Sequence, residues 1–118
     1  MNARRYFATM AARSRVWRIT PRTGASGWVT GFLARSVPEA QAFHARPLWT
    51  TPPDAPTGPV LYLDYLLTGG WSKPQRAAVV AAIRHDCPTV RWVVWYRPTA
   101  GDDRCVIKEM PRWRARIR

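Results

Sequence analysis

The sequence predicts a small α+β domain, with a mixed or antiparallel β-sheet and one main helix packed on a face. Three observations lead to this prediction. A nearly unbroken apolar run at residues 60–67 is typical of an interior strand. Residues 72–86 have helical apolar spacing between clear start and stop signals. Residues 89–97 and 104–110 follow as two strand-like runs separated by a turn.

The composition is that of a folded and strongly basic domain. A single domain over residues 1–118 is the natural size, and 47% hydrophobic residues with seven Trp exclude a disordered chain. Nineteen Lys and Arg against seven Asp and Glu give a net charge of +12, which favours an anionic partner such as nucleic acid or a phosphorylated cofactor. Because the basic residues are spread along the chain, Arg-rich codon usage is the alternative explanation.

The termini and the cysteines bear on location. Residues 1–15 are expected to form a basic arm or a short helix, although their Arg- and Ala-rich, acid-free composition also resembles a transit peptide. No secretory signal or membrane-spanning run is apparent. Cys87 and Cys105 are expected to be free thiols. We therefore expect a cytoplasmic protein of a bacterial host cell, or a virion component if the protein is a phage structural protein.

The first half of the chain is predicted to form a hairpin followed by a short helix. Residues 16–20 and 27–35 have strand character on either side of a turn-rich segment. Gly31, inside the second strand, indicates a bulge or a close approach of the backbone. Residues 37–45 are expected to be helical, with Ser36 as the N-cap and a capping-box glutamate three residues later.

A long, stiff loop separates this helix from the interior strand. Residues 46–59 contain five prolines, so they cannot form a regular element. Such a loop is either a functional cover or a surface excursion, and Trp49 is expected to anchor it to the core. His44, directly before the loop, is the better placed of the two histidines to reach a cleft.

Asp64 is the most informative residue of the interior strand. A carboxylate within a buried strand costs several kcal/mol unless it is paired or hydrogen-bonded. The structural interpretation is an ion pair with Arg91 or Arg97 on the neighbouring strand. The functional interpretation is an acid–base catalyst, because catalytic carboxylates are often buried. The sequence leaves both open.

The turn after this strand has the composition of a phosphate-binding turn. Gly69 and Gly70 allow a ligand to approach the backbone, and the helix capped by Ser72 presents free N–H groups. Lys73 and Arg76 add positive charge. Neither nucleotide-binding glycine fingerprint is present.

Three consecutive segments, LYLDYLLTGG, KPQRAAVVAAIRHDCP and TVRWVVWYRP, resemble the C-terminal half of the GNAT-type acyltransferase fold. They are most similar to the toxin-activating lysine acyltransferases. By this resemblance, Asp64 is the catalytic aspartate, and the turn at residues 69–73 holds the phosphopantetheine of an acyl carrier or the pyrophosphate of coenzyme A. In the functional hypothesis built on it, His44 would be the partner of Asp64, and Gly69, Gly70, Lys73 and Arg76 would form the cofactor cradle. The resemblance implies an acyl donor, a protein acceptor and no metal.

Two departures from this family keep a second class of function open. The catalytic histidine of that family lies far upstream of the aspartate, whereas no histidine precedes His44 in this chain. The acetyltransferase loop Q/R-x-x-G-x-G/A is absent as well. The chain is therefore either an acyltransferase or a non-catalytic relic of one. The alternative is a basic nucleic-acid-binding protein or a phage virion or assembly protein. In that case the phosphate-binding residues of the basic tail, residues 111–118, are Arg112, Arg114, Arg116 and Arg118.

Overall fold

The chain folds into a five-stranded mixed sheet with a helix on each face. The computed structural model describes residues 4–5, 8–9, 12, 14–19, 27–47, 50, 52–67, 73–98 and 100–110. The elements are β1 (Arg15–Ile19), β2 (Gly27–Ala34), α2 (Val37–His44), β3 (Val60–Leu67), α3 (Lys73–Asp86), β4 (Trp92–Pro98) and β5 (Asp103–Glu109).

The strands follow one another across the sheet in sequence order, from β1 to β5. All neighbouring pairs are antiparallel except β3 and β4, which are parallel and joined by α3. A parallel pair requires such a crossover, because its second strand must start at the same end of the sheet as the first. The predicted α+β class with a mixed sheet is therefore confirmed.

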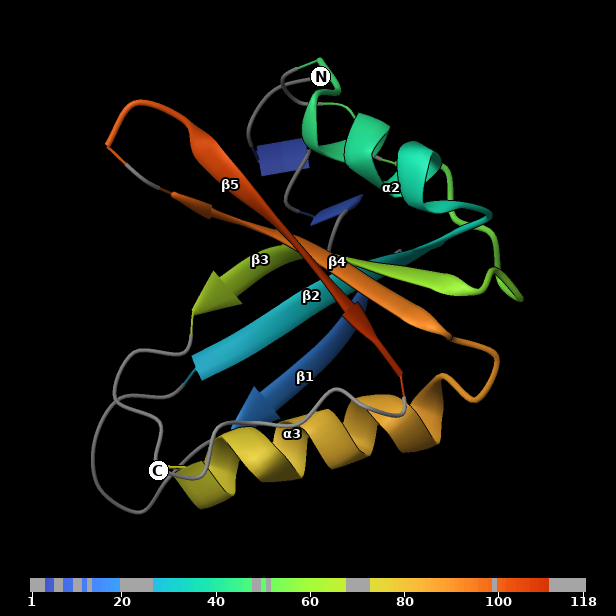
Figure 1. Cartoon of the computed structure of the whole chain (residues 1–118), viewed down its shortest axis with the longest axis vertical. Helices are drawn as coiled ribbons and strands as arrows, with labels where there is room; N and C mark the ends of the chain where they lie inside the picture. The colour runs from blue at the N-terminus through green and yellow to red at the C-terminus, as the bar shows by residue number, and fades with distance from the viewer. Residues whose placement is uncertain are drawn as a thin grey trace.

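Helices α2 and α3 cover opposite faces of the sheet (Figure 1). On the α3 face, Ile83 and Val79 pack with Leu61, Leu63 and Val93. On the α2 face, the core consists of Phe32, Ala34, Ala40, Phe43, Val60, Tyr62 and Val94. The prediction of a helix on a single face was thus incomplete, since the short helix that the sequence places before the loop covers the other face.

Helix α3 forms where the pattern of apolar residues predicts it. The expected stripe of Val79, Val80, Ile83 and Cys87 is buried, and Pro88 follows directly after the last turn. One polar contact joins the end of this helix to β1, where the Trp17 indole Nε1–H donates to Asp86 Oδ2 at 2.9 Å.

Helix α2 begins at its predicted cap. The backbone N–H of Glu39 donates to Ser36 Oγ at 3.2 Å, which satisfies one of the free donors of the first turn. The Glu39 carboxylate returns to the backbone N–H of Arg35 at 3.3 Å instead of closing the box on Ser36. Ala40 and Phe43 are the buried residues of this helix.

The proline-rich segment packs along β2 and has no helix or strand among its described residues. Asp54 accepts from the backbone N–H of Leu33 at 2.8 Å and from Arg15 at 2.6 Å. The N–H of Ala55 donates to the Leu33 carbonyl at 2.9 Å. At Gly58 a Cβ atom would lie 2.2 Å from the Ala34 carbonyl oxygen, so this close passage requires glycine. Trp49, the predicted anchor, lies outside the described residues.

A β-bulge interrupts the pairing of β2 with β3. Thr30 pairs with Tyr65 and Gly31 pairs with Leu63, so Asp64 is the extra residue without a partner on β2. A Cβ at Gly31 would lie 2.9 Å from Leu61 Cδ1 and 3.2 Å from the Tyr62 carbonyl oxygen. The sequence predicted a bulge or a close backbone approach at Gly31, and both are present.

The remaining differences from the sequence prediction are small shifts of boundaries. The strand expected at 89–97 begins at Trp92, because residues 87–90 form a turn closed by the Val90 N–H and the Cys87 carbonyl at 3.1 Å. In the N-terminal arm, residues 4–5, 8–9 and 12 are helical. Both cysteines are free thiols. No helix in the described part of the chain is long and apolar enough to cross a membrane.

Candidate functional site

Asp64 points to the α2 face and binds an arginine from the segment after α2. Arg46 forms a bidentate ion pair with Asp64, in which NH1 lies 3.0 Å from Oδ1 and NH2 lies 3.1 Å from Oδ2. The side chains of Arg46 and Asp64 are only 17% and 13% exposed. The structural interpretation of Asp64 as one half of an ion pair with an arginine is confirmed. The candidate partners were wrong, because Arg91 and Arg97 are exposed and the segment after α2 brings Arg46 to the bulge instead.

The Arg46 guanidinium is fixed by backbone carbonyl groups as well as by Asp64. NH1 also donates to the Phe43 carbonyl at 2.8 Å, and Nε donates to the Thr50 carbonyl at 2.7 Å. These contacts close the end of α2 and the start of the proline-rich segment around the charged pair. The charge of Asp64 is therefore balanced within the fold, and its carboxylate is held in one orientation.

His44, the last residue of α2, joins this site through Tyr62. The Tyr62 hydroxyl lies 3.4 Å from His44 Nδ1, and Asp103 Oδ2 lies 2.8 Å from Nε2. The imidazole stacks on the ring of Tyr96, with centroids 3.7 Å apart and planes 7° apart. The structure thus brings the two predicted catalytic residues, Asp64 and His44, to the two sides of one buried phenol.

Burial raises the pKa of both tyrosines of this cluster. Desolvation, followed by the negative charge of Asp64, raises the pKa of the Tyr62 hydroxyl far above its ordinary value. Burial, together with a hydrogen bond to Cys105, raises the pKa of Tyr96 to about 12. Both phenols therefore keep their protons at physiological pH.

The Thr30 hydroxyl lies next to the bulge. Thr30 shares with Phe32 and Ala34 the alternate positions of β2 that face α2, and it pairs with the residue after Asp64. Its Oγ1 is fully enclosed and has no hydrogen-bond partner within the described part of the chain. A buried hydroxyl of this kind is costly unless a bound molecule or water satisfies it.

The two parallel strands separate at this same place. Among the described residues, β3 and β4 pair only from Val60 with Trp92 to Tyr62 with Val94. Beyond these three pairs both strands continue, β3 to Leu67 and β4 to Pro98, and they diverge (Figure 1). The ladder between the two strands therefore ends beside the bulge. Asp64 lies on one side of this divergence and Tyr96 on the other.

A hollow of about 570 Å³ lies between α2 and the proline-rich segment. Arg46 and Glu39 are its charged lining residues, and the remainder of its lining is apolar: Ala42, Phe43, Ala45, Pro47, Pro52 and Pro53. The hydrogen bonds of Arg46 to Asp64, Phe43 and Thr50 occupy its guanidinium. The free surface of this hollow is therefore mainly apolar.

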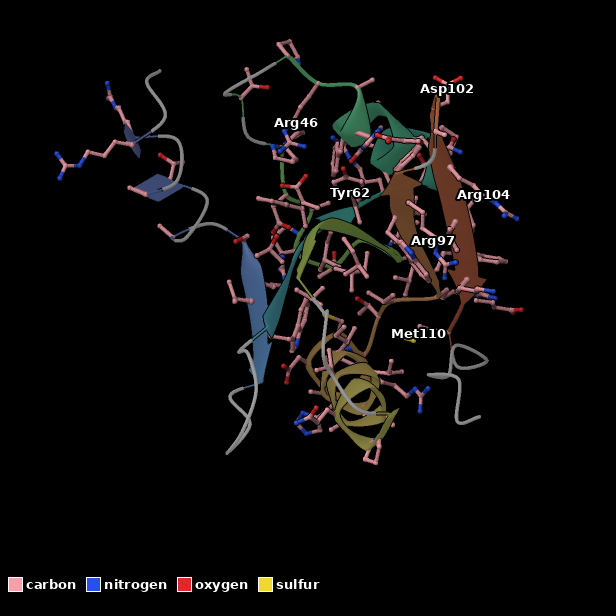
Figure 2. All side chains as sticks on the ribbon, turned by 90° about the vertical axis from the view of Figure 1, so that its left-hand side faces the viewer. Arg46, Tyr62, Arg97, Asp102, Arg104 and Met110 are labelled. Atoms are coloured by element: carbon pink, nitrogen blue, oxygen red, sulfur yellow. The ribbon has the colours of Figure 1, made fainter. Side chains whose placement is uncertain are left out.

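A second feature lies on the opposite face, on the hairpin of β4 and β5. Arg97 and Arg104 are directly opposite each other across the two strands, and Lys108 lies on the same face. All three side chains are exposed, and no carboxylate of the described residues pairs with either arginine. Figure 2 shows both arginines on the hairpin, with Asp102 at its tip, away from Arg46 and Tyr62. Like charges in this register repel each other.

Several predicted ligand-binding residues cannot be placed in this site. Gly69 and Gly70 lie outside the described residues. Lys73 and Arg76 belong to the first turns of α3, but their side chains are not among those described. The tail residues Arg112, Arg114, Arg116 and Arg118 also lie outside. Among the described residues, no group of three or more His, Cys, Asp or Glu side chains is arranged to hold a metal.

Five residues of the site were missed in the sequence: Thr30, Arg46, Tyr62, Tyr96 and Asp103. Their contacts join positions that are far apart in the chain, such as His44 and Asp103, 59 residues apart. One available signal was the position of Tyr62, two residues before Asp64 in the same strand, since alternate residues of a strand share a face. The chain matches no protein-family model, no curated protein and no solved structure.

Proposed function

We propose that this protein is a GNAT-like acyltransferase that takes its acyl group from a phosphopantetheine thioester, either of coenzyme A or of an acyl carrier protein. The observation that carries the proposal is the divergence of β3 and β4 beside the Asp64 bulge. A parallel pair joined by a crossover helix, with an aspartate in its first strand, is also what the resemblance of residues 60–110 to this fold implies.

The divergence suits an extended ligand that contains amide groups. The ladder between β3 and β4 stops after Tyr62 and Val94, although both strands continue beyond this point. The pantetheine arm is an extended chain with two amides, and such a chain binds between strands as an added strand does. Its thioester end would then lie near Asp64 and the unsatisfied Thr30 hydroxyl.

The surroundings of the bulge suit the other parts of such a ligand. The mainly apolar hollow next to Arg46 offers a place for an acyl chain. Gly69, Gly70, Lys73 and Arg76 remain the proposed cradle for the phosphate groups, at the start of the helix that follows β3. A protein side chain would be the acceptor.

The first test is thermal stability in the presence of defined thioesters. Coenzyme A, acetyl-CoA, octanoyl-CoA and an octanoylated acyl carrier protein are each titrated against the full chain. A ligand at one hundred times its Kd stabilises the folded state by about 2.7 kcal/mol, which raises the melting temperature by several degrees. No rise with any of these ligands at millimolar concentration contradicts the proposal.

A matched pair of variants locates the binding site. Asp64→Asn changes the carboxylate at the divergence, whereas Asp102→Asn makes the same change at the exposed tip of the hairpin. We expect the stabilisation by octanoyl-CoA to be reduced in Asp64→Asn and retained in Asp102→Asn. Equal behaviour of the two variants would place the ligand elsewhere.

We propose polyanion binding as the second candidate function, favoured by the Arg97–Arg104 pair and Lys108. An anion that bridges the two guanidinium groups relieves their repulsion. Neutralising three phosphates gives a slope of about −2 to −3 for log affinity against log salt on single-stranded and duplex DNA. Arg112, Arg114, Arg116 and Arg118 would add to this slope.

Fluorescence anisotropy of labelled DNA and RNA at two salt concentrations measures this slope. Arg104→Glu is expected to weaken binding strongly, whereas Arg84→Glu, the same charge reversal on the exposed side of α3, has a smaller effect. Absence of binding at low salt, or equal losses in the two variants, rejects nucleic acid as a ligand of this face.

A further inference from the structure

Three side chains from three strands surround the imidazole of His44. Asp103 of β5 approaches Nε2 at 2.8 Å, and Tyr62 of β3 approaches Nδ1 at 3.4 Å. Tyr96 of β4 stacks on the ring. Both nitrogen atoms and one face of the ring are thereby engaged, so the orientation of the imidazole is fixed even though 35% of the side chain is exposed.

The hydrogen-bonding capacities of these groups determine where the protons lie. An ionised carboxylate only accepts hydrogen bonds, so His44 Nε2 must carry a proton to bind Asp103. Neutral imidazole has a single N–H, so Nδ1 is then the acceptor. The Tyr62 hydroxyl, whose pKa is raised by burial and by the charge of Asp64, keeps its proton and has two acceptors for it, His44 Nδ1 and an Asp64 oxygen.

A second proton on His44 reverses this hydrogen bond. Nδ1 then donates to the Tyr62 oxygen, and the Tyr62 proton is left with Asp64, which also hydrogen-bonds this hydroxyl, as its acceptor. Arg46 takes one position on each Asp64 oxygen, and a carboxylate offers about four such positions. Rotation of the Tyr62 hydroxyl therefore allows a proton gained at His44 to be passed on to Asp64.

We propose that Asp103, His44 and Tyr62 form a proton relay that connects solvent to Asp64, which rests on the proposed acyltransferase function. Asp64 is the end that meets the acceptor, and His44 is the more exposed end. Tyr62 passes the proton between them, and Asp103 is a positioning residue that keeps Nδ1 free to receive it. The charged groups that face the relay are Asp103, Asp64 and Arg46.

In the reaction, the relay removes the proton that the acceptor loses. The nitrogen of an acceptor amine forms a bond with the thioester carbonyl carbon, and the C–S bond breaks with its electron pair on sulfur. The amine proton passes to an Asp64 oxygen, from there to the Tyr62 oxygen, while the Tyr62 proton moves to His44 Nδ1. The leaving thiolate takes a proton from solvent, and His44 returns its proton to solvent.

The test is the tautomer of His44, measured by nitrogen-15 NMR of the full chain. The chain has two histidines, and His85→Gln assigns the signals. We expect neutral His44 to be the Nε2–H tautomer, with the Nδ1 shift displaced by the hydrogen bond from Tyr62. A neutral Nδ1–H tautomer in the wild-type protein would overturn the relay.

Two matched pairs of variants separate the relay from simple packing. Tyr62→Phe should move the Nδ1 shift toward its unbonded value, whereas Tyr96→Phe keeps the stacked ring and should leave the shift unchanged. Asp103→Asn should mix the two tautomers, whereas Asp102→Asn should not. An unchanged Nδ1 shift in folded Tyr62→Phe also rejects the proposal.

Activity gives an independent readout, which distinguishes failure of the relay from failure of the proposed function. With octanoyl-CoA as donor and Nα-acetyl-lysine as acceptor, release of free thiol measures turnover. Tyr62→Phe should lower kcat about 10²-fold with KM unchanged, and Asp102→Asn should retain turnover. If the wild-type protein releases no thiol, the acyltransferase proposal fails. If it is active and folded Tyr62→Phe is equally active, the relay fails.

Discussion

On the α3 face of the sheet, Ile83, Leu61 and Val93 are completely buried in a cluster without a charged side chain. On the α2 face, an equally buried set around Phe32 and Val60 continues into Tyr62, where Arg46, Asp64 and His44 follow. Successive residues of β3 point alternately into these two environments. The core under α3 is therefore purely apolar, whereas the core under α2 continues into a cluster of charged and polar side chains.

The polar α2 face is expensive to build. Charged groups on this face lose water, and partners within the fold compensate for the loss, as the pair of bonds between Arg46 and Asp64 does. Thr30 is the exception, because its hydroxyl has no partner among the described residues. Variants that remove one group from each face should therefore separate packing from polar compensation.

The largest effect is expected on the α3 face, at Ile83. This side chain is fully buried, so Ile83→Ala removes apolar contacts and leaves a cavity. We expect the free energy of unfolding to fall by about 2–5 kcal/mol, measured by urea unfolding. Val16→Ala, at a position that is 45% exposed, is the control and should change stability by less than about 0.5 kcal/mol. Similar losses in both would contradict a close-packed α3 face.

The second effect tests the charge balance on the α2 face. Arg46→Met leaves the Asp64 carboxylate unpaired in a site where it is 13% exposed. Breaking a fully buried pair costs about 3–5 kcal/mol, and the partial exposure lowers our expectation to about 2 kcal/mol. Urea unfolding measures the loss.

A second substitution and a control complete this test. Adding Asp64→Asn to Arg46→Met removes the unpaired charge and should restore part of the stability. Arg35→Met breaks the surface pair of Arg35 with Glu39, which is worth about 0–1 kcal/mol. If Arg46→Met costs no more than Arg35→Met, the pair contributes little to the fold.

The third effect has the opposite sign. Thr30→Val replaces an enclosed hydroxyl without a partner by a methyl group of similar shape, so it should stabilise the free protein by about 1 kcal/mol. The same variant should weaken stabilisation by octanoyl-CoA if the hydroxyl binds the thioester. Thr89→Val, whose hydroxyl donates to the Gly58 carbonyl at 3.5 Å, should bring no gain. A destabilised Thr30→Val would show that the hydroxyl is satisfied.

The sequence predicts the α3 face well because its information is local. The helical spacing of its apolar residues predicts α3, and a run that is apolar on both faces predicts that residues 60–67 form an interior strand. The bulge at Gly31 was also predictable, because a glycine within a strand is typical of a bulge or of a close approach by another backbone. That Asp64 is its extra residue depends on the register between β2 and β3.

The α2 face depends on contacts that no local pattern encodes. The sequence singles out Asp64 and His44, but the partner of Asp64 is decided by the path of the proline-rich segment. That path brings Arg46 into an ion pair with Asp64, whereas Arg91 and Arg97 are exposed. Asp103 reaches His44 only after the β4–β5 hairpin is paired. Asp64 and His44 could therefore be chosen from the sequence, whereas their partners could be identified only from the folded structure.

The smallest effect concerns the hydrogen bond between Trp17 and Asp86 at the edge of the apolar face. Two hydrogen bonds lower the pKa of the exposed Asp86 carboxyl: the bond from Trp17 Nε1–H, which has the larger effect, and the bond from His85. Because the pKa of Asp86 is lower in the folded protein, ionised Asp86 stabilises the fold above its unfolded-state pKa of about 3.9. This contribution is lost as the pH falls through the pKa of the folded state. The indole N–H signal of Trp17 should therefore shift below about pH 4. In Asp86→Asn this shift should disappear, and a signal that titrates unchanged in that variant would assign it to another carboxyl group.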